Sequence, residues 1–116
     1  MSDKALTWED VICKVEGLRS LPDDWDGMGA AKPSPAAIDR TMQLCRFFAA
    51  FGWTLPFRVV PSPAGTVGFE WQGDDGQGRY YREIEVNTDG TADWMVVDEN
   101  NHAEHGGLDQ VEAQSP

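Results

Sequence analysis

Basic residues are scarce in this chain, which has 9 Lys and Arg against 20 Asp and Glu and a formal net charge of −11 at pH 7. Nucleic acid and anionic membrane surfaces would repel such a chain, which argues against direct binding to either. Residues 98–116 contain five acids and no Lys or Arg. The excess of negative charge favours either simple solubility or a partner with a basic surface.

Long apolar runs are also missing. No stretch approaches the roughly 20 apolar residues that a membrane-spanning helix needs. The N-terminus, "MSDKALTWED", has early acids and lacks the apolar centre of a signal peptide. We therefore expect a cytoplasmic protein with no membrane partner.

Cysteine and histidine are few, with two of each. Cys13 and Cys45 lie far apart, match no metal-binding spacing and fall on helical stripes, so we expect reduced, buried thiols. His102 and His105 lie in the predicted C-terminal tail. A catalytic Ser–His or Cys–His pair would therefore have to use a histidine of that tail. No glycine-rich phosphate-binding motif occurs between a strand and a helix. We expect no catalytic residues, no metal and no cofactor, and hence no enzyme.

Two amphipathic helices are predicted in the first half of the chain. Thr7 can cap the first, with Asp10 at the third helical position, and apolar residues then recur at steps of three and four as far as Ser20. Ser34 and Pro35 begin the second helix, which ends at Gly52. Its apolar face is unusually broad. We therefore expect this helix either to pack against other elements on more than one side or to bind a partner.

The pattern changes to period two after Gly52. Four strands are predicted at residues 57–60, 67–72, 80–86 and 92–97. The fold class is then α+β, with two N-terminal helices packed on one face of a four-stranded antiparallel meander. We expect one domain over residues 1–97, followed by a flexible acidic tail over residues 98–116.

The register of the last predicted hairpin follows from its turn. With Thr88-Asp89-Gly90 as a three-residue loop and Gly90 left-handed, Ile84 faces Trp94. A two-residue loop would bury a charge and is rejected. Trp8, Trp71 and Trp94 then lie in the core. A polar set lies on the opposite face and is the candidate partner-binding surface: Glu70, Gln72, Tyr81, Glu83, Glu85 and Asp93. The simpler interpretation is that this polar face contacts only water, as one face of many antiparallel sheets does.

The segment "DWDGMGA" is predicted to fasten the fold. Trp25 would insert between the first helix and the sheet, and Asp26 would accept backbone hydrogen bonds or pair with Arg82. Gly27 and Gly29 would supply positive φ for a sharp reversal. Arg82 is the one inward-facing charge, and its alternative is to extend past the sheet edge. A surface recognition loop is the competing interpretation.

The residues Trp25-Asp26-Gly27-Met28-Gly29-Ala30, the later Glu70-Trp71 and the segments "REIEV" and "DGTADW" occur together in this order. As a set they resemble a group of small, poorly characterised bacterial proteins that share a Trp-Asp-Gly-x-Gly-Ala segment and a Glu-Trp strand. The resemblance covers roughly residues 18–97. It implies no catalytic residues, and it implies a general association with toxin, defence or mobile-element genes.

These observations favour a small acidic, non-enzymatic protein that occludes a basic surface of a protein partner. An antitoxin, an immunity protein or a phage-type inhibitor of nucleic-acid machinery, such as an anti-CRISPR-like or DNA-mimic protein, would act in this way. The partner would be a toxin or a nucleic-acid-binding protein. The alternative is a structural or accessory subunit, or a homodimer, that assembles through Phe47 and Phe51 of the second helix. An enzyme using Glu70, Glu83 or Glu85 is a third hypothesis.

Overall fold

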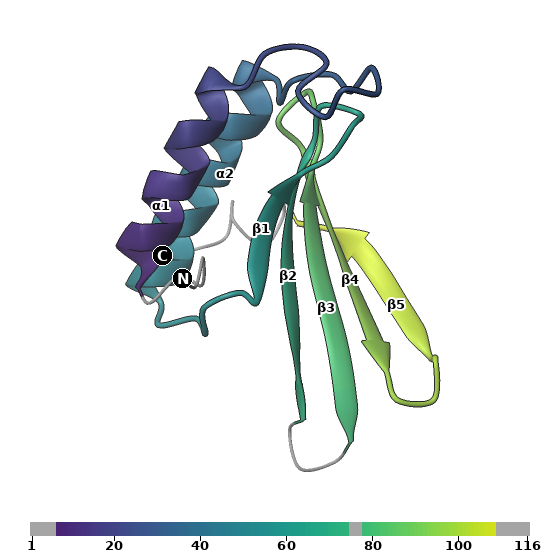
Figure 1. Ribbon diagram of the computed structural model, residues 1–116. Coiled ribbons are helices and arrows are strands. Elements are labelled where there is room, and N and C mark those ends of the chain that lie inside the picture. Colours follow the sequence, from purple (N-terminus) through teal and green to yellow (C-terminus); the bar gives the residue numbers. More distant parts are fainter. Residues whose placement is uncertain (1–6, 75–77, 109–116) are drawn as a thin grey trace, which may run out of the picture.

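The computed structural model describes residues 7–74 and 78–108, which form two α-helices beside a five-stranded antiparallel sheet (Figure 1). The helices are α1 (Trp8–Gly17), continued by the short 3-10 helix η1 (Leu18–Ser20), and α2 (Pro35–Ala50). The strands are β1 (Arg58–Pro61), β2 (Val67–Asp74), β3 (Arg79–Val86), β4 (Ala92–Asp98) and β5 (Ala103–Gly107). The predicted α+β class and the order of helices before strands are therefore confirmed.

Both helices begin where the sequence predicts. The Thr7 hydroxyl accepts from the Asp10 backbone N–H at 3.1 Å, and the Asp10 carboxylate accepts from the Thr7 N–H at 3.0 Å, which completes a capping box. Ser34 caps α2 by accepting from the Ala37 N–H at 3.0 Å, with Pro35 at the first helical position. Neither helix of the described chain has the length and apolar character to span a membrane.

The sheet is a simple meander in the order β1-β2-β3-β4-β5. In the β3–β4 ladder Ile84 pairs with Trp94 and Val86 with Ala92, and Gly90 has φ 88°, as the three-residue loop predicts. The predicted number of four strands is wrong, because β5 pairs with β4. The sheet thus extends past the expected boundary at residue 97 as far as residue 107, and residues 109–116 of the expected tail lie outside the described residues.

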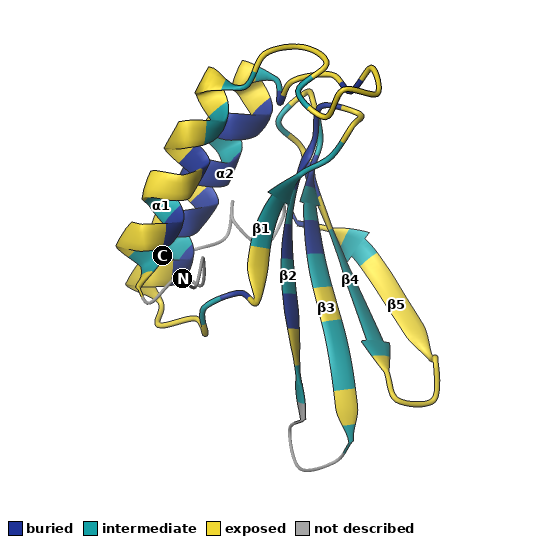
Figure 2. Ribbon diagram, viewed as in Figure 1, coloured by how far each residue is buried: buried dark blue, intermediate teal, exposed yellow. Residues whose placement is uncertain are grey.

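The core lies between the helices and the upper part of the sheet, where Figure 2 shows the buried residues of α2 and the strands facing each other. Phe48 of α2 is at its centre. Its fully buried ring contacts the rings of Trp8, Trp53, Phe69 and Trp71, with centroids between 4.2 and 5.9 Å away. The broad apolar face of α2 is explained by this double cover, since α2 contacts both α1 and the sheet.

One cysteine is placed differently from the expectation. Cys45 on α2 is fully buried, and this burial raises the pKa of its thiol to about 12. Cys13 on α1 is exposed, so the prediction of two buried thiols is wrong for it. Val11 and Val15 mark the buried side of α1. Cys13 lies two positions from each, about 200° around the helix, and therefore faces outward.

The connection between η1 and α2 ties the helices to the turns of the sheet. Ala31 N–H donates to the Pro63 carbonyl at 2.9 Å, Ser34 N–H donates to the Gly65 carbonyl at 3.1 Å, and the Ser34 hydroxyl donates to the Thr88 carbonyl at 2.8 Å. Figure 1 shows this loop lying over the β1–β2 and β3–β4 turns. This segment therefore fastens α2 to two hairpins at once.

The residues inside this loop fulfil part of the predicted role. Asp26 accepts from the backbone N–H groups of Met28 and Ala30, and Gly27 and Gly29 have φ of 75° and 87°. Trp25, however, is half-buried and lies outside the core cluster, and its indole N–H donates to the nearby Ala31 carbonyl at 2.9 Å. The expected insertion of Trp25 between α1 and the sheet is wrong, because Trp8, Val11 and Val15 already occupy that layer.

Arg82 also differs from the expectation. Its guanidinium lies over the Tyr80 ring, with Cζ 4.4 Å from the ring centroid, and makes no pair with Asp26. A cation over an aromatic face satisfies part of the charge without a carboxylate. Arg82 is exposed, although β3 is the central strand and not an edge of the sheet.

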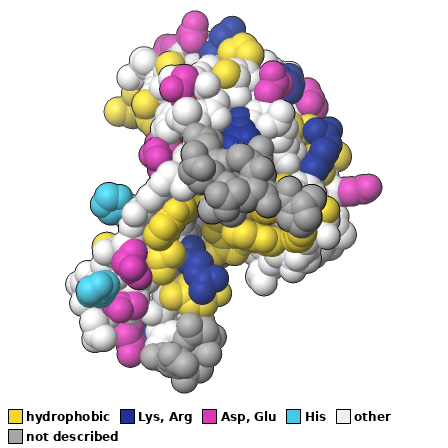
Figure 3. All heavy atoms as spheres, turned by 180° about the vertical axis from the view of Figure 1, so that it is seen from behind, with side chains coloured by type: hydrophobic (Ala, Val, Ile, Leu, Met, Phe, Trp, Pro, Cys, Tyr) yellow, Lys and Arg dark blue, Asp and Glu magenta, His cyan; other side chains and the backbone are white. Residues whose placement is uncertain are grey.

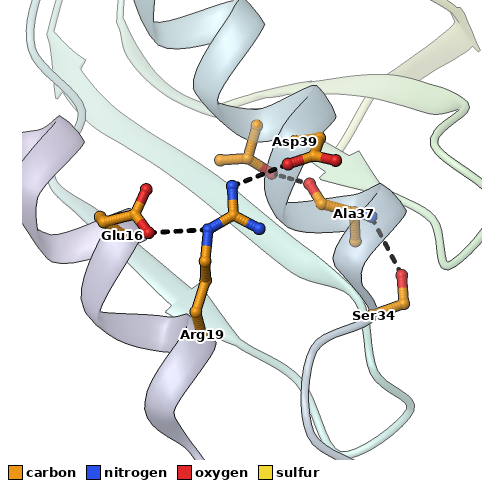
Figure 4. A network of polar contacts seen from close by, with 6 residues as sticks. Glu16, Arg19, Ser34, Ala37 and Asp39 are labelled. Carbon is orange, nitrogen blue, oxygen red and sulfur yellow. Dashed lines mark hydrogen bonds and ion pairs between the residues drawn. The ribbon is translucent and has the colours of Figure 1, made fainter.

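Arg19 joins the two helices at the surface (Figure 4). Its Nε donates to Glu16 at 2.7 Å and its second guanidinium nitrogen donates to Asp39 of α2 at 2.7 Å. The hydrogen bond to Asp39 is the main cause of the raised pKa of Arg19. Because the side chains of Arg19 and Asp39 are both partly exposed, water screens the pair, and it adds little to stability.

Candidate protein-binding face

The sheet has one face toward the helices and one face away from them, which we call the outer face. Strand alternation and the ladder pairings place on it Arg58, Glu70, Gln72, Arg79, Tyr81, Glu83, Glu85, Asp93, Met95, Val97 and His105. All six predicted partner-binding residues share this face. The pairing therefore brings together every polar residue that the sequence pattern assigned to it.

Four carboxylates on the outer face form two opposed pairs. Glu70 on β2 lies directly opposite Glu83 on β3, and Glu85 on β3 lies directly opposite Asp93 on β4. Directly opposed side chains have Cβ atoms about 4.5–5.5 Å apart, so like charges at these positions repel. The four acids thus form a compact negative patch across three strands.

Each carboxylate is held by a neighbouring donor. Glu70 pairs with Arg58 at 2.9 Å, and this bond raises the pKa of the Arg58 guanidinium. Tyr81 donates its hydroxyl to Glu83 at 2.7 Å. The Thr66 hydroxyl donates to Glu85 at 2.9 Å, and the Asn87 amide donates to Asp93 at 3.0 Å.

Tyr81 is the most perturbed group of the outer face. Partial burial is the largest cause of a pKa well above its usual value, and the hydrogen bond to Glu83 adds to it, because both disfavour the phenolate. Tyr81 therefore stays a neutral donor at physiological pH. It orients Glu83 without cancelling its charge.

Gln72 is exposed and lies opposite Tyr81 near the far end of the sheet. None of the hydrogen bonds found among the described residues involves its amide. Gln72 therefore extends the polar surface beside the acids and does not order them.

Several outer-face residues, and two residues that hydrogen-bond to outer-face acids, were not among the predicted ones. Arg58, Met95 and Val97 follow from the same alternation that selected the acids, so the signal was present. Thr66 and Asn87 lie in turns, and their hydrogen bonds depend on the ladder register. His105 lies on β5, whose sequence "AEHGG" has two glycines and no β-branched residue and so resembles no strand.

A metal centre is not indicated in this region. Residues 7–74 and 78–108 contain no group of three or more His, Cys, Asp or Glu side chains that could hold a metal ion. The outer face is a pleated surface whose acids lie side by side, whereas acid–base catalysis requires groups that converge on one substrate atom. The outer face is therefore an anionic surface whose acids lie side by side.

No family model, curated protein or solved structure matches this chain. Function is therefore inferred from the residues and their geometry. The resemblance to the small bacterial proteins with a Trp-Asp-Gly-x-Gly-Ala segment stays a prediction.

Proposed function

We propose that this protein is a non-enzymatic binding protein that covers a basic surface of a protein partner with its outer sheet face. The supporting observation is the pair of like-charge contacts, Glu70 with Glu83 and Glu85 with Asp93. Opposed like charges cost free energy in the isolated sheet. A basic partner would relieve that repulsion on binding.

The donors around these acids favour recognition over internal neutralisation. Tyr81, Thr66 and Asn87 are neutral, so they fix the positions of Glu83, Glu85 and Asp93 and leave the negative charge in place. Among the described residues, Glu70 is the one acid of this patch with an ion pair. A rigid patch that keeps its charge is suited to electrostatic steering of a cationic partner.

The patch presents its negative charges in a regular array, as a nucleic-acid backbone presents its phosphates. Neighbouring strands are about 4.8 Å apart, and residues two apart on one strand are separated by about 6.8 Å. Glu83 and Glu85 therefore repeat at about 6.8 Å along β3, which is about twice the 3.4 Å axial spacing of charges along one nucleic-acid strand. The partner class we propose is a nucleic-acid-binding protein or toxin, blocked by occlusion of its basic surface.

The test compares two charge-matched variants in affinity capture from the native host. E83Q/E85Q/D93N removes three charges from the outer face. E9Q/E16Q/E104Q removes three from exposed positions on α1 and β5 that are not on the outer face. We expect a basic protein to be captured by the wild type and the control triple, to be lost with the face triple, and to dissociate as salt is raised.

Two results would contradict the proposal. One is equal capture of the same partners by both triple variants. The other is capture that does not change between low and high salt. Identity of the partner by mass spectrometry then tests whether it binds nucleic acid.

A second candidate is self-association through the end of α2. Phe51 is 50% exposed and its ring lies 4.8 Å from that of Phe47, with Trp53 40% exposed nearby. Light scattering of the wild type and F51D tests it. A dimer in the wild type that dissociates in F51D supports this candidate, and a monomer at every concentration removes it.

A further inference from the structure

A cavity of about 530 Å³ opens on the helix-facing side of the sheet. Its walls come from the chain after α2 and from β2, β3 and β4, with Trp53, Trp71, Trp94, Val96 and Leu108 among its apolar lining. The volume falls within the range of about 300–1,000 Å³ that is typical of small-molecule sites, which are mostly apolar with a few placed polar groups. This cavity has no part in the outer-face proposal and stands independently of it.

The aromatic walls of the cavity are fixed. The Trp71 indole N–H donates to the Thr54 carbonyl at 2.8 Å, and the Trp53 ring stacks on Phe48 with centroids 4.2 Å apart. Trp94 lies across Gly106, where an added Cβ would be 3.0 Å from its ring atoms. Walls held in this way lose little conformational entropy when a ligand enters.

Two of the side chains that line this cavity, Arg82 and Trp94, carry hydrogen-bond donors and no acceptor. Within residues 7–74 and 78–108, neither the Arg82 guanidinium nor the Trp94 indole N–H has a hydrogen-bond acceptor. The two side chains are diagonal neighbours on β3 and β4, because Ile84 pairs with Trp94 and Arg82 with Val96. Glu83 also borders the cavity, but its carboxylate accepts from Tyr81 on the outer face.

These donors are complementary to a ligand that carries a negatively charged group at one end. Figure 3 shows a Lys or Arg side chain surrounded by hydrophobic side chains in the lower half of the view. The planar face of Arg82 is used by Tyr80, which leaves its N–H edge free to donate to a carboxylate. Indole rings supply flat apolar contact for the rest of the ligand.

We propose that this cavity binds a small apolar carboxylate, with the carboxylate on Arg82 and Trp94 and the apolar body between the tryptophans. An aromatic acid and a short fatty acid share this chemistry. We expect the cavity to bind this ligand without any chemical reaction.

Titration calorimetry of the full chain with three probes tests the proposal. 2-Naphthoate carries an aromatic body and a carboxylate, naphthalene-2-methanol has the same ring without the charge, and decanoate has a flexible chain with the charge. We expect saturable one-site binding of a carboxylate and binding of the alcohol that is about ten-fold weaker or more. Tighter binding of naphthoate than of decanoate identifies an aromatic acid as the ligand class, and the reverse order identifies a fatty acid.

Variants locate the site. R82Q should weaken carboxylate binding by about ten-fold and leave binding of the alcohol unchanged. W94F keeps a ring and loses the N–H, so a loss of about two- to ten-fold is expected. R79Q removes the same charge from the outer face of the same strand and should bind like the wild type. Equal carboxylate binding by R82Q and wild type, or equally tight binding of the alcohol, would overturn the proposal.

Discussion

Glu85 on β3 lies directly opposite Asp93 on β4, so that two carboxylates face each other across the ladder of the outer face. Removing one charge should remove the repulsion while an amide oxygen still accepts from Thr66. We expect E85Q to raise the free energy of unfolding by about 0.2–1 kcal/mol. Urea denaturation at low salt measures it, and the gain should shrink as salt is added.

Glu9 provides a control, because its replacement should change the free energy of unfolding in the opposite direction. It is exposed in the first turn of α1, where a negative charge interacts favourably with the helix dipole. E9Q should therefore lower the free energy of unfolding by about 0.3–1 kcal/mol. If E85Q lowered the free energy of unfolding, as E9Q is expected to do, this result would contradict the repulsion assigned to Glu85 and Asp93.

The raised pKa of Tyr81 predicts that the folded protein loses stability at alkaline pH. Its folded-state pKa is raised above the ordinary value of 10.0 by burial and by Glu83, so the folded protein holds the phenolic proton more tightly than the unfolded chain. The stabilising contribution is therefore complete below about pH 10 and is lost as pH rises above it. Urea midpoints across this range should fall more steeply for the wild type than for Y81F.

Tyr80 is the matched control for that measurement. It lies on the opposite face of the same strand, under Arg82, so Y80F should keep the steep alkaline decline. An alkaline decline in Y81F equal to that of the wild type would show that another group causes it.

Trp25 and Phe48 should differ clearly in their contributions to stability. Phe48 is fully buried among five other rings, so F48A should cost about 3–5 kcal/mol. Trp25 is half-buried and outside the core, so W25A should cost only about 1–2 kcal/mol, from the hydrogen bond to Ala31 and part of the ring area. A loss in W25A as large as that in F48A would mean that Trp25 is a core residue.

Gly106 and Gly107 form a matched pair on β5. A Cβ at Gly106 would lie 3.0 Å from the Trp94 ring, whereas a Cβ at Gly107 meets nothing within 4 Å. G106A should therefore displace Trp94 and cost about 1–3 kcal/mol, while G107A should be neutral or slightly stabilising. Thermal unfolding compares the two variants. Equal stability would show that Trp94 does not lie across Gly106.

The elements that could be predicted from sequence are those with local signals. Thr7 and Ser34 cap helices through contacts within four residues, and the β3–β4 register follows from a three-residue turn. The six candidate residues share one face because strand alternation is a local property. The same alternation places Arg58 and Met95 there.

The remaining differences arise from tertiary contacts. Strand β5 forms because its backbone pairs with β4, although its glycines carry no strand signal. Trp25 stays outside the core because Trp8, Val11 and Val15 fill the layer beside the sheet. Arg82 lies over Tyr80, a neighbour two positions away whose ring orientation no sequence pattern specifies.

Capture of a basic partner by the wild type and by the two charge-matched triple variants, at low and high salt, tests the central claim most directly. We predict that E9Q/E16Q/E104Q captures the partner as the wild type does, that E83Q/E85Q/D93N loses it, and that salt weakens the interaction. Equal capture by both triple variants, or capture unaffected by salt, would contradict the assignment of the outer face as the binding surface.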